Sequence, residues 1–423
     1  MTVFQFDEDD HPTLKSRTIS GGSFAHFSVA ENPSDSESDP DPETEELLEQ
    51  VIQAESLPKA DSEFIVPLEE PFVASLVENA TVNRKVGPED FEQLKVIGRG
   101  AYGKVLLVRQ KATGRCFAMK VLKKASIIVH TKNTEYSKTE RAILEEVSHP
   151  FIVKLFYAFQ TNAKLYLILD YVAGGELFTH MAKERMFEED VARFFTAELV
   201  LALEHLHSLG IIYRDLKPEN CLLDNEGHIV LTDFGLSKVA LNTNDGKTNT
   251  MCGTTQYMAP EVLLEVYYDK AVDWWSLGIM IYDMLTGAPP FKGSNRKKTM
   301  EAILNKKLRF PNYISPDAKD LMTRLLRKSP AVRLGSGPDG ASAIKKHPFF
   351  RTIDWKALAR REIKSPIIPL LSSADDVSNF DTQFTSLTVL ESPASPSPIS
   401  ASFNRLFQGF SFVDRSTYLP YHE

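Results

Sequence analysis

The hydrophobic residues of this 423-residue chain first fall into a regular pattern near Phe91. Aliphatic and β-branched runs at 94–97, 104–108 and 116–122, with glycine-containing turns between them, predict three strands. A polar segment at 133–147 predicts a helix with an apolar face, and the apolar run at 165–169 predicts a further strand. The first ordered part of the chain is therefore expected to be rich in β-sheet.

Beyond residues 174–175 the apolar residues recur at helical spacing. One helix is expected to end at Gly210, and its apolar face consists of Phe195, Leu199, Ala202, Leu203 and Leu206. The segment 274–285 is apolar nearly all round, which indicates a helix buried inside a large lobe. We therefore predict an α+β fold with a small strand-rich lobe followed by a larger, mainly helical lobe.

Charge is distributed unequally along the chain. Residues 1–86 carry 19 acidic and 5 basic side chains, whereas the remainder carries 38 acidic and 43 basic side chains. The acidic segment is also rich in Ser and Pro, so we expect residues 1–86 to be a largely disordered tail. The remainder contains no charge block dense enough to argue for nucleic-acid binding.

No apolar run reaches the roughly 18 residues that a membrane span requires, so no membrane association is expected. Acidic residues at 7–10 argue against a secretory signal. The cysteines are far apart and odd in number (Cys116, Cys221 and Cys252), which favours neither a disulfide framework nor a zinc site. We therefore expect a reducing compartment, the cytosol or also the nucleus.

Gly98, Gly100 and Gly103 have the spacing G-x-G-x-x-G. A dinucleotide-binding fingerprint should open a helix, but a β-rich run follows here. A P-loop needs Ser or Thr after Lys104, and Val105 stands there instead. A glycine hairpin over ATP phosphates fits, because backbone without Cβ atoms can approach the phosphates closely. Taken alone, the motif is also compatible with a plain hairpin.

Lys120 lies mid-strand among apolar neighbours, and Glu140 shares a helix face with Leu144 and Val147. A lone buried ammonium and a lone buried carboxylate are each costly. Both are tolerated if they neutralise one another, and the ammonium can then also hold phosphate oxygens. The alternative is an exposed lysine and an unrelated, solvent-facing glutamate.

The strongest motif is YRDLKPEN at 213–220, followed further on by DFG. Phosphoryl transfer asks a protein mainly for positioning and charge compensation. Asp215 can orient an acceptor hydroxyl and take its proton, and Lys217 can offset charge on the moving phosphoryl group. Asn220 and Asp233 offer the oxygen ligands that Mg²⁺ prefers. This set of residues indicates ATP-dependent phosphoryl transfer.

With these motifs the chain resembles the eukaryotic protein kinase superfamily over residues 91–350, and its tail at 351–423 resembles that of the AGC group. The resemblance implies a bilobal kinase fold with ATP and Mg²⁺ as cofactors. The implied catalytic residues are Asp215, Lys217, Lys120 and Glu140, and the implied metal ligands are Asn220 and Asp233. The implied nucleotide site comprises Ile97, Gly98, Gly100, Gly103, Val105, Ala118, Lys120, Asp170, Val172 and Leu223, with Ala118 and Leu223 sandwiching the adenine.

The same resemblance implies two supports for the catalytic centre. Glu261, in the motif APE, is expected to pair with Arg333. Asp273 is expected to brace the catalytic loop. No catalytic position is missing, which argues against a nucleotide-binding pseudokinase scaffold, the alternative function.

Phosphorylation sites also follow from the AGC resemblance. Thr250, in TMCGT, matches the activation site, and a phosphate there would add about −1.5 to −2 charges. Arg214 and Lys238 are the matching cations. The Ser/Pro-rich tail contains the turn-motif candidate Ser392, with Ser395 and Ser397 as alternatives.

The segment FQGFSF at 407–412 matches the AGC hydrophobic motif, with Ser411 as its phosphorylation site. Aromatic side chains on an exposed tail should seek a groove. The family's groove lies where this chain has Arg141, Gln160 and Leu165. Because Arg141 belongs to the helix predicted at 133–147, a phosphate on Ser411 is expected to push that helix inward.

Among AGC kinases the chain looks most like the ribosomal protein S6 kinases, through TMCGT, LTGAPPF, NRKKT and FDTQFT. The resemblance implies a growth or nutrient signalling kinase acting on ribosomal protein. Its upstream partners would be an activation-loop kinase and a TOR-type kinase, although Phe6–Asp10 keeps only the beginning of the usual TOR-docking motif. We expect a monomer.

The substrate site implied by the resemblance consists of Glu176, Glu219, Asp283 and Thr254. Acidic residues at the first three positions predict protein substrates with Arg two to five residues before Ser or Thr. A small-molecule kinase on the same fold is the remaining alternative, and the activation segment, the aromatic tail motif and these acidic residues argue against it.

Overall fold

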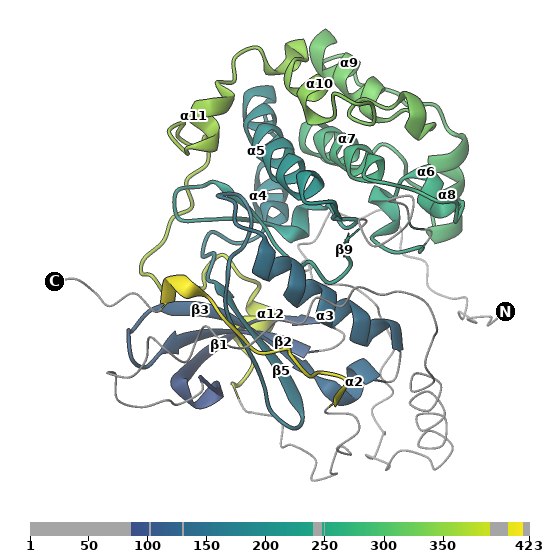
Figure 1. The fold of residues 1–423 in the computed structure, drawn as a ribbon. Helices are drawn as coiled ribbons and strands as arrows, with labels where there is room; N and C mark the ends of the chain where they lie inside the picture. The colour runs from purple at the N-terminus through teal and green to yellow at the C-terminus, as the bar shows by residue number, and fades with distance from the viewer. Residues whose placement is uncertain are drawn as a thin grey trace, which may run out of the picture. The chain divides into compact units, whose positions relative to one another are not determined.

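The computed structural model describes residues 86–100, 103–128, 131–239, 248, 250–389 and 405–417 (Figure 1). The expected disordered tail lies outside these residues except for Val86. Ala101 and Tyr102 of the glycine loop lie outside them as well, as do the turn-motif candidates Ser392, Ser395 and Ser397. The expectations for those segments stay predictions.

A six-stranded antiparallel sheet forms the first lobe, in the order β1-β2-β3-β5-β4-β10. Its strands are β1 (Phe91–Gly100), β2 (Gly103–Gln110), β3 (Cys116–Lys123), β4 (Leu155–Gln160), β5 (Lys164–Asp170) and β10 (Phe412–Val413). Apolar side chains from β1 to β5 form one buried cluster, in which the rings of Phe91 and Phe117 meet edge to face at 6.2 Å. The four strands expected from the apolar runs are present, and β4 and β10 are additional.

Two helices accompany this sheet, α2 (Lys124–Ile128) and α3 (Thr131–Glu146). The apolar face predicted for α3 is buried, because Ile143, Leu144 and Val147 are at most 4% exposed. Figure 1 shows α3 running across the sheet towards the helical lobe. This position brings Glu140 of α3 to Lys120 of β3.

The second lobe is mainly helical. Its helices are α4 (Leu177–Glu184), α5 (Glu189–Ser208), α6 (Pro260–Leu263), α7 (Ala271–Thr286), α8 (Arg296–Asn305), α9 (Pro316–Leu325), α10 (Ala341–Lys345) and α11 (Trp355–Ala359). The predicted central helix is α7, in which Trp274 and Trp275 are at most 1% exposed. Gly287 ends α7 with a φ of 74°, a left-handed conformation that favours glycine.

Short strands and 3₁₀ turns complete the helical lobe and the tail. The two small sheets pair β6 (Ile211–Ile212) with β9 (Lys238–Val239) and β7 (Cys221–Leu223) with β8 (Ile229–Leu231). The 3₁₀ turns of the helical lobe and the tail are η2 (Pro218–Asn220), η4 (Thr255–Tyr257), η5 (Pro330–Val332), η6 (Pro348–Phe350) and η7 (Arg415–Thr417), and the tail contains α12 (Thr382–Thr385). A further 3₁₀ turn, η1 (Pro88–Asp90), precedes β1 in the first lobe. The antiparallel sheet and the separate helical lobe confirm the α+β, two-lobed fold.

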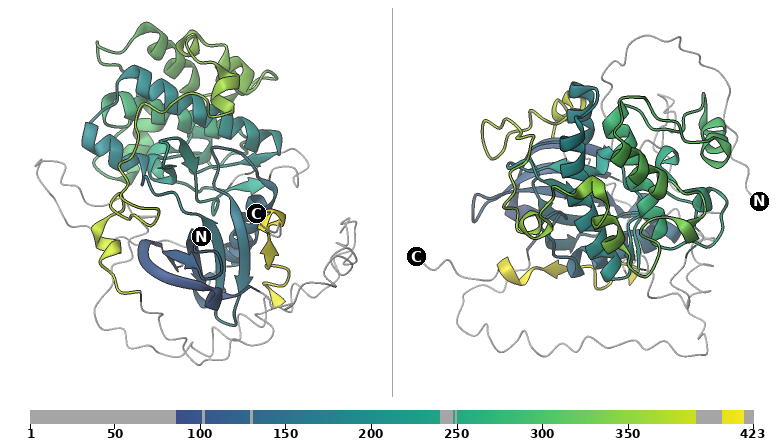
Figure 2. Two further views of the ribbon diagram at one scale, coloured as in Figure 1. Left: turned by 90° about the vertical axis from the view of Figure 1, so that its left-hand side faces the viewer. Right: turned by 90° about the horizontal axis from the view of Figure 1, so that it is seen from above.

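The far end of the C-terminal tail returns to the sheet of the first lobe. Phe412 and Val413 of β10 pair with Ala158 and Tyr157 of β4. Figure 2 shows this last described segment, in yellow, running beside the sheet. Within the described residues, no helix combines the length and apolarity that a membrane span would need.

Candidate active site

Lys120 lies between two carboxylates that come from different parts of the fold. Its Nζ is 2.6 Å from Glu140 Oε1 on α3 and 2.9 Å from Asp233 Oδ1, which follows β8. Burial works to lower the pKa of Lys120, but Asp233 and Glu140 outweigh it and raise that pKa. Burial raises the pKa of Glu140. The pKa of Asp233 is lowered, because the effect of Lys120 outweighs that of burial. The ammonium is therefore held charged, as the sequence predicted for this pair.

The loop before β7 gathers polar groups around Asp215. Lys217 Nζ lies 2.9 Å from Asp215 Oδ2, and Asn220 Nδ2 donates to the same oxygen at 3.0 Å. Thr254 donates from its Oγ1 to Asp215 Oδ1 at 3.2 Å and accepts from Lys217 Nζ at 3.1 Å. Burial raises the pKa of Asp215, and Lys217 opposes the rise. A carboxylate in this setting is fixed in position and is a stronger base than usual.

Asp273 of α7 holds the backbone of this loop. Its carboxylate accepts from the N–H groups of Tyr213 at 3.0 Å and Arg214 at 2.8 Å, and His207 contacts it at 2.8 Å. Asp273 is fully buried. Arg214 has a φ of 71°, a strained conformation that such surroundings can maintain. The expected bracing role of Asp273 therefore has a direct structural basis.

Arg333 and Glu261 also form the expected pair. The guanidinium donates to both carboxylate oxygens, at 2.5 and 2.8 Å. Neither side chain is more than 4% exposed. This bidentate pair ties the residue that follows η5 to α6.

A cavity of about 50 Å³ lies next to Lys120 and Asp233. Its walls include most of the predicted nucleotide residues, namely Ile97, Val105, Ala118, Lys120, Asp170 and Val172. The prediction of Leu223 is wrong, because Leu222 lines the cavity and Leu223 is fully buried away from it. Successive side chains of a strand point to opposite faces, so a shift of one residue in β7 exchanges the two.

Phe380, from the tail, lines the same cavity and was missed by the sequence analysis. Its ring stacks on that of Tyr171 with centroids 5.8 Å apart, and the Tyr171 hydroxyl donates to the Asp376 carbonyl. Arg109 of β2 anchors the same tail segment through Asp375 at 2.7 Å. The only sequence signal for this wall was the aromatic start of the FDTQFT motif.

The predicted glycines lie at the end of β1 and the beginning of β2 and are not among the residues that line the cavity. Gly100 pairs with Gly103, and Gly98 pairs with Val105. A Cβ atom on Gly103 would lie 1.8 Å from the Val121 carbonyl oxygen. The close approach of β3 is thus a reason for glycine at 103 that is independent of any phosphate.

Asn220, which precedes β7, and Asp233, which follows β8, each carry a side-chain oxygen that can bind a metal ion, and Asp233 lines the cavity. Asn220 is 1% exposed and commits its Nδ2 to Asp215, which fixes the orientation of the amide. The described residues contain no group of three or more His, Cys, Asp or Glu suited to a metal. One carboxylate and one amide fit an ion that takes its other ligands from water and substrate phosphates, as Mg²⁺ does.

The predicted substrate residues form an acidic region next to the catalytic loop. Burial, then the nearby Glu219, raises the pKa of Glu176 to about 8. Glu219 Oε2 is buried, and no hydrogen-bond donor among the described residues reaches it. Asp283 is also buried and accepts from the Tyr257 hydroxyl at 2.6 Å. A buried carboxylate oxygen without a donor, such as Glu219 Oε2, is costly, and a cation would relieve that cost.

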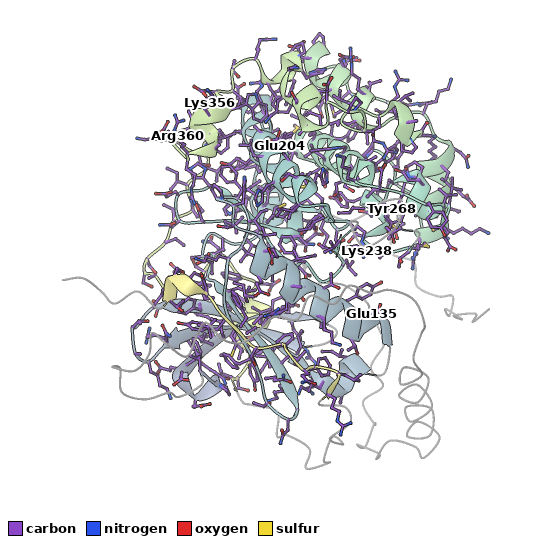
Figure 3. All side chains as sticks on the ribbon, viewed as in Figure 1. Glu135, Glu204, Lys238, Tyr268, Lys356 and Arg360 are labelled. Carbon is purple, nitrogen blue, oxygen red and sulfur yellow. The ribbon has the colours of Figure 1, made fainter. Side chains whose placement is uncertain are left out.

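Thr250 lies near the cations predicted for it. Its carbonyl oxygen accepts from the Tyr268 hydroxyl at 2.6 Å, and Arg214 donates to that hydroxyl at 3.2 Å. Lys238 Nζ donates to Thr248 Oγ1 at 3.1 Å. Figure 3 shows Lys238 and Tyr268 on the side of the helical lobe that faces α3.

The hydrophobic motif occupies the predicted groove. Phe407 and Phe410 are at most 3% exposed, whereas Ser411 is exposed. Gln160 donates to the Phe407 carbonyl at 2.7 Å, and Arg141 donates to the Ser411 carbonyl at 3.4 Å. Leu165, the third predicted residue of the groove, is fully buried.

Comparison with known proteins agrees with this geometry. Residues 91–350 match the protein kinase domain, and residues 371–412 match the protein kinase C terminal domain. The chain therefore belongs to the protein kinase family.

Its similar relatives are ribosomal protein S6 kinases. It is 54% identical to ribosomal protein S6 kinase alpha-1 of Homo sapiens over 334 residues. These residues make up 78% of this chain and 45% of the relative. Ribosomal protein S6 kinase 2 alpha of Gallus gallus is also 54% identical, with 78% and 44% covered. Ribosomal protein S6 kinase beta of Caenorhabditis elegans is 50% identical over 353 residues, with 82% and 64% covered.

These matches confirm the predicted resemblance to AGC-group S6 kinases. The chain spans less than half the length of the chicken and human relatives. Membership of the protein kinase family implies ATP and a divalent metal ion as cofactors.

Proposed function

We propose that this protein is an active serine/threonine kinase that transfers the γ-phosphoryl group of ATP to protein substrates. The observation that carries the proposal is the grouping of Asp215, Lys217 and Thr254 within 3.2 Å of one another, next to the Lys120–Asp233 contact. A scaffold without catalysis would not need a base held by an ammonium group at 2.9 Å in addition to the Lys120–Asp233 pair.

In the proposed reaction the acceptor hydroxyl oxygen forms a bond to the γ-phosphorus of ATP, and the bond to the β–γ bridging oxygen breaks. Asp215 takes the hydroxyl proton, for which its burial-raised pKa suits it. Lys217 offsets charge on the transferring group, and Lys120 holds phosphate oxygens while Glu140 fixes its position. ADP and the phosphorylated protein are the products.

Asn220 and Asp233 would hold the divalent ion, which we propose is Mg²⁺ because both donors are oxygens. When bound, the ion neutralises charge on the phosphate oxygens. The chain prepares both ligands, because Asp215 orients Asn220 at 3.0 Å and Lys120 orients Asp233 at 2.9 Å.

We propose substrates with Arg upstream of the target residue, because Glu176, Glu219 and Asp283 lie together by the catalytic loop. A substrate guanidinium would supply the donor that Glu219 Oε2 lacks among the described residues. Relatives are named for ribosomal protein S6, and we propose a basic ribosomal protein of that kind as the substrate in the cytosol.

We also propose activation by phosphorylation at Thr250 and Ser411, by an activation-loop kinase and a TOR-type kinase respectively. Arg214 and Lys238 would receive the first phosphate, and Arg141 would receive the second. The proposed turn-motif site, Ser392, lies outside the described residues.

Phosphorylated full-length protein should transfer labelled phosphate from ATP and magnesium to a Ser peptide with Arg at upstream positions. Replacing those arginines by Ala should reduce kcat/KM, and Asp215→Ala should abolish transfer without abolishing nucleotide binding. Binding of ATP without transfer by the wild type would support the scaffold alternative. Equal transfer by wild type and Asp215→Ala would remove Asp215 from the proposed role.

A further inference from the structure

Three large apolar side chains are exposed in the loop that follows α6. Leu264 is 58%, Val266 is 48% and Tyr267 is 71% exposed. The backbone of this loop is nevertheless held in place, because the Val266 N–H donates to the Glu261 carbonyl oxygen at 3.2 Å and the next residue, Tyr268, is buried. Apolar side chains that gather on a fixed and exposed backbone are typical of a surface that binds another segment of protein.

A cluster of cations lies on the neighbouring helix α8. Figure 1 shows α6 and α8 side by side at the edge of the helical lobe. Arg296, Lys297 and Lys298 form the first turn of α8, and all three are exposed. That turn contains no acidic residue, and no carboxylate of the described residues forms an ion pair with these cations. Cations at the N-terminal, positive end of a helix are unfavourable, and an anionic partner would relieve that repulsion.

The apolar side chains and the cations belong to one face of the helical lobe. Leu263 of α6 and Ile303 of α8 are buried in the same apolar cluster, and Met300 of α8 packs against that cluster. We call the face formed by residues 264–267 and 296–300 the α6–α8 surface. It offers an apolar part beside a basic part, so it fits a partner that is both apolar and acidic.

One segment of the chain outside the described residues has this chemistry. Residues 3–10 read VFQFDEDD, in which Phe4 and Phe6 stand directly before four consecutive acidic residues. Four extended residues span about 13 Å, so their carboxylates can meet all the cations of one helical turn. Residues 45–52 also contain both kinds of side chain, but only two of their acidic residues are adjacent. The segment 3–10 therefore matches the charge of the α6–α8 surface better.

The intervening chain is long enough for this contact. Residues 11–85 separate the segment from Val86, the first described residue, and a chain of that length can extend to about 250 Å. A segment tethered in this way has an effective concentration on the order of 0.1–1 mM. An intrinsic Kd on the order of 0.1 mM is therefore sufficient for docking within one molecule.

We propose that residues 3–10 dock on the α6–α8 surface of the same chain. The phenylalanines lie against the exposed loop after α6, and the acidic residues lie against the first turn of α8. While the segment is docked, neither it nor the surface that it covers is available to another protein. Docking does not require phosphoryl transfer, so this proposal and the proposed kinase function can fail independently.

A photo-cross-linking residue in place of Phe6 tests the contact in the full-length protein. After irradiation, Phe6→p-benzoylphenylalanine should give intramolecular cross-links that mass spectrometry assigns to residues 264–267 or to α8. Cross-links only to other parts of the chain, or only between two copies of it, would overturn the proposal. The same substitution at Leu48 tests the other candidate segment, and cross-links to the surface from Leu48 alone would also overturn it.

Charge reversal on α8 separates a specific contact from general attraction between opposite charges. Arg296→Glu together with Lys297→Glu should lower the cross-link yield from position 6 about fivefold or more. Lys306→Glu together with Lys307→Glu is the matched control, because both lysines are exposed just beyond the other end of α8. The control changes the net charge equally and should alter the yield less than about twofold. Equal losses in the two variants would show that the contact is not at the first turn.

A compensating reversal in the segment makes the charge test independent of folding defects. Asp7→Lys together with Asp9→Lys should lower the yield in the otherwise unchanged protein about fivefold, and should restore it when combined with the reversal at Arg296 and Lys297. No restoration in the combined variant would contradict direct pairing of the segment with α8.

The apolar part of the contact is tested at two exposed side chains. Tyr267→Ser should lower the cross-link yield about threefold or more, because it removes apolar area that the phenylalanines cover. Leu370→Ser is the control, since Leu370 is 89% exposed but lies outside the α6–α8 surface, and it should leave the yield unchanged. Equal yields in these two variants would remove the apolar part of the surface and overturn the proposal.

Discussion

Two of the ion pairs that join distant segments of this molecule, Arg333–Glu261 and Lys120 with Glu140 and Asp233, differ in how many of their hydrogen-bonding groups are satisfied. Arg333 is fully buried and directs its guanidinium to Glu261 and to the carbonyl oxygens of Ala271, Arg327 and Lys328. Lys120 is 18% exposed and shares one ammonium between Glu140 and Asp233. The first pair is saturated and has no capacity for a ligand. The second keeps capacity on the side of the cavity, as a site that exchanges ligands requires.

Because of this difference, we expect substitutions at the saturated pair to affect mainly stability and substitutions at the Lys120 pair, the open pair, to affect mainly activity. The largest expected effect is on activity at the open pair. Lys120→Met should lower kcat/KM for peptide phosphorylation about 10³-fold, because it removes a positioned charge at the phosphates. Its free energy of unfolding should fall less than that of Arg333→Met, because the side chain of Lys120 is 18% exposed whereas that of Arg333 is fully buried. Kinase assays and urea unfolding measure the two quantities. A Lys120→Met variant that lost activity and also as much stability as Arg333→Met would contradict this difference between the two pairs.

At the saturated pair the expected effect is on stability. Arg333→Met should lower the free energy of unfolding by about 3–5 kcal/mol, because it leaves Glu261 buried without its partner. Arg351→Met is the control, since Arg351 is 68% exposed where it pairs with Asp317 and should cost only about 0–1 kcal/mol. Urea unfolding of the two variants tests this prediction, and similar losses would contradict it.

A smaller effect on activity should come from the tail that packs near the open pair. Phe407→Ala should lower kcat roughly tenfold. The expected cause is a change of about 1.4 kcal/mol in the free-energy difference between α3 positions with and without the Lys120–Glu140 contact, which changes the ratio of their populations tenfold. Gln408→Ala is the neighbouring control, since Gln408 is exposed. Steady-state kinetics of the doubly phosphorylated protein make the comparison. Equal activity of both variants would show that the groove does not influence α3.

The smallest expected effect concerns pH at Glu176. Burial, followed by Glu219, raises its pKa from an ordinary 4.5 to about 8. An upstream arginine needs the ionised carboxylate, so KM for an Arg peptide should fall a few-fold between about pH 6 and 9 relative to a matched Ala peptide. Glu176→Gln should remove this pH dependence, and an unchanged profile in that variant would assign it elsewhere.

The same shift has a consequence for stability, with the opposite sense in pH. The folded carboxyl holds its proton more tightly than the unfolded one, so its contribution to stability is fully present below about pH 4.5 and is lost as pH rises towards 8. Glu176→Gln should therefore flatten the dependence of Tm on pH within that window.

The sequence predicted those parts of the site that local chemistry determines. Lys120 among apolar neighbours needed a carboxylate, and Glu140 is at hydrogen-bond distance. Leu222 and Leu223 could not be told apart in this way, because all three residues of β7 are buried and no alternation marks the face. The one-residue error is the result of that missing pattern.

Other features depend on contacts between segments far apart in the chain. Phe380 lines the cavity beside Lys120, where Arg109 and Tyr171 hold the tail, and nothing near Phe380 in sequence indicates those partners. Local patterns in the sequence predict the helices, the strands and the catalytic motif. They do not predict cavity walls to which several distant segments contribute.

The pairing of β10 with β4 has one more consequence. A strand with a free edge presents its backbone N–H and carbonyl groups to any other strand that approaches it. In this molecule the tail covers the β4 edge, and the Asp414 N–H bonds to the Phe156 carbonyl oxygen at 2.8 Å. Undocking of the hydrophobic motif would uncover that edge, so the same contact also protects concentrated protein from self-association and precipitation.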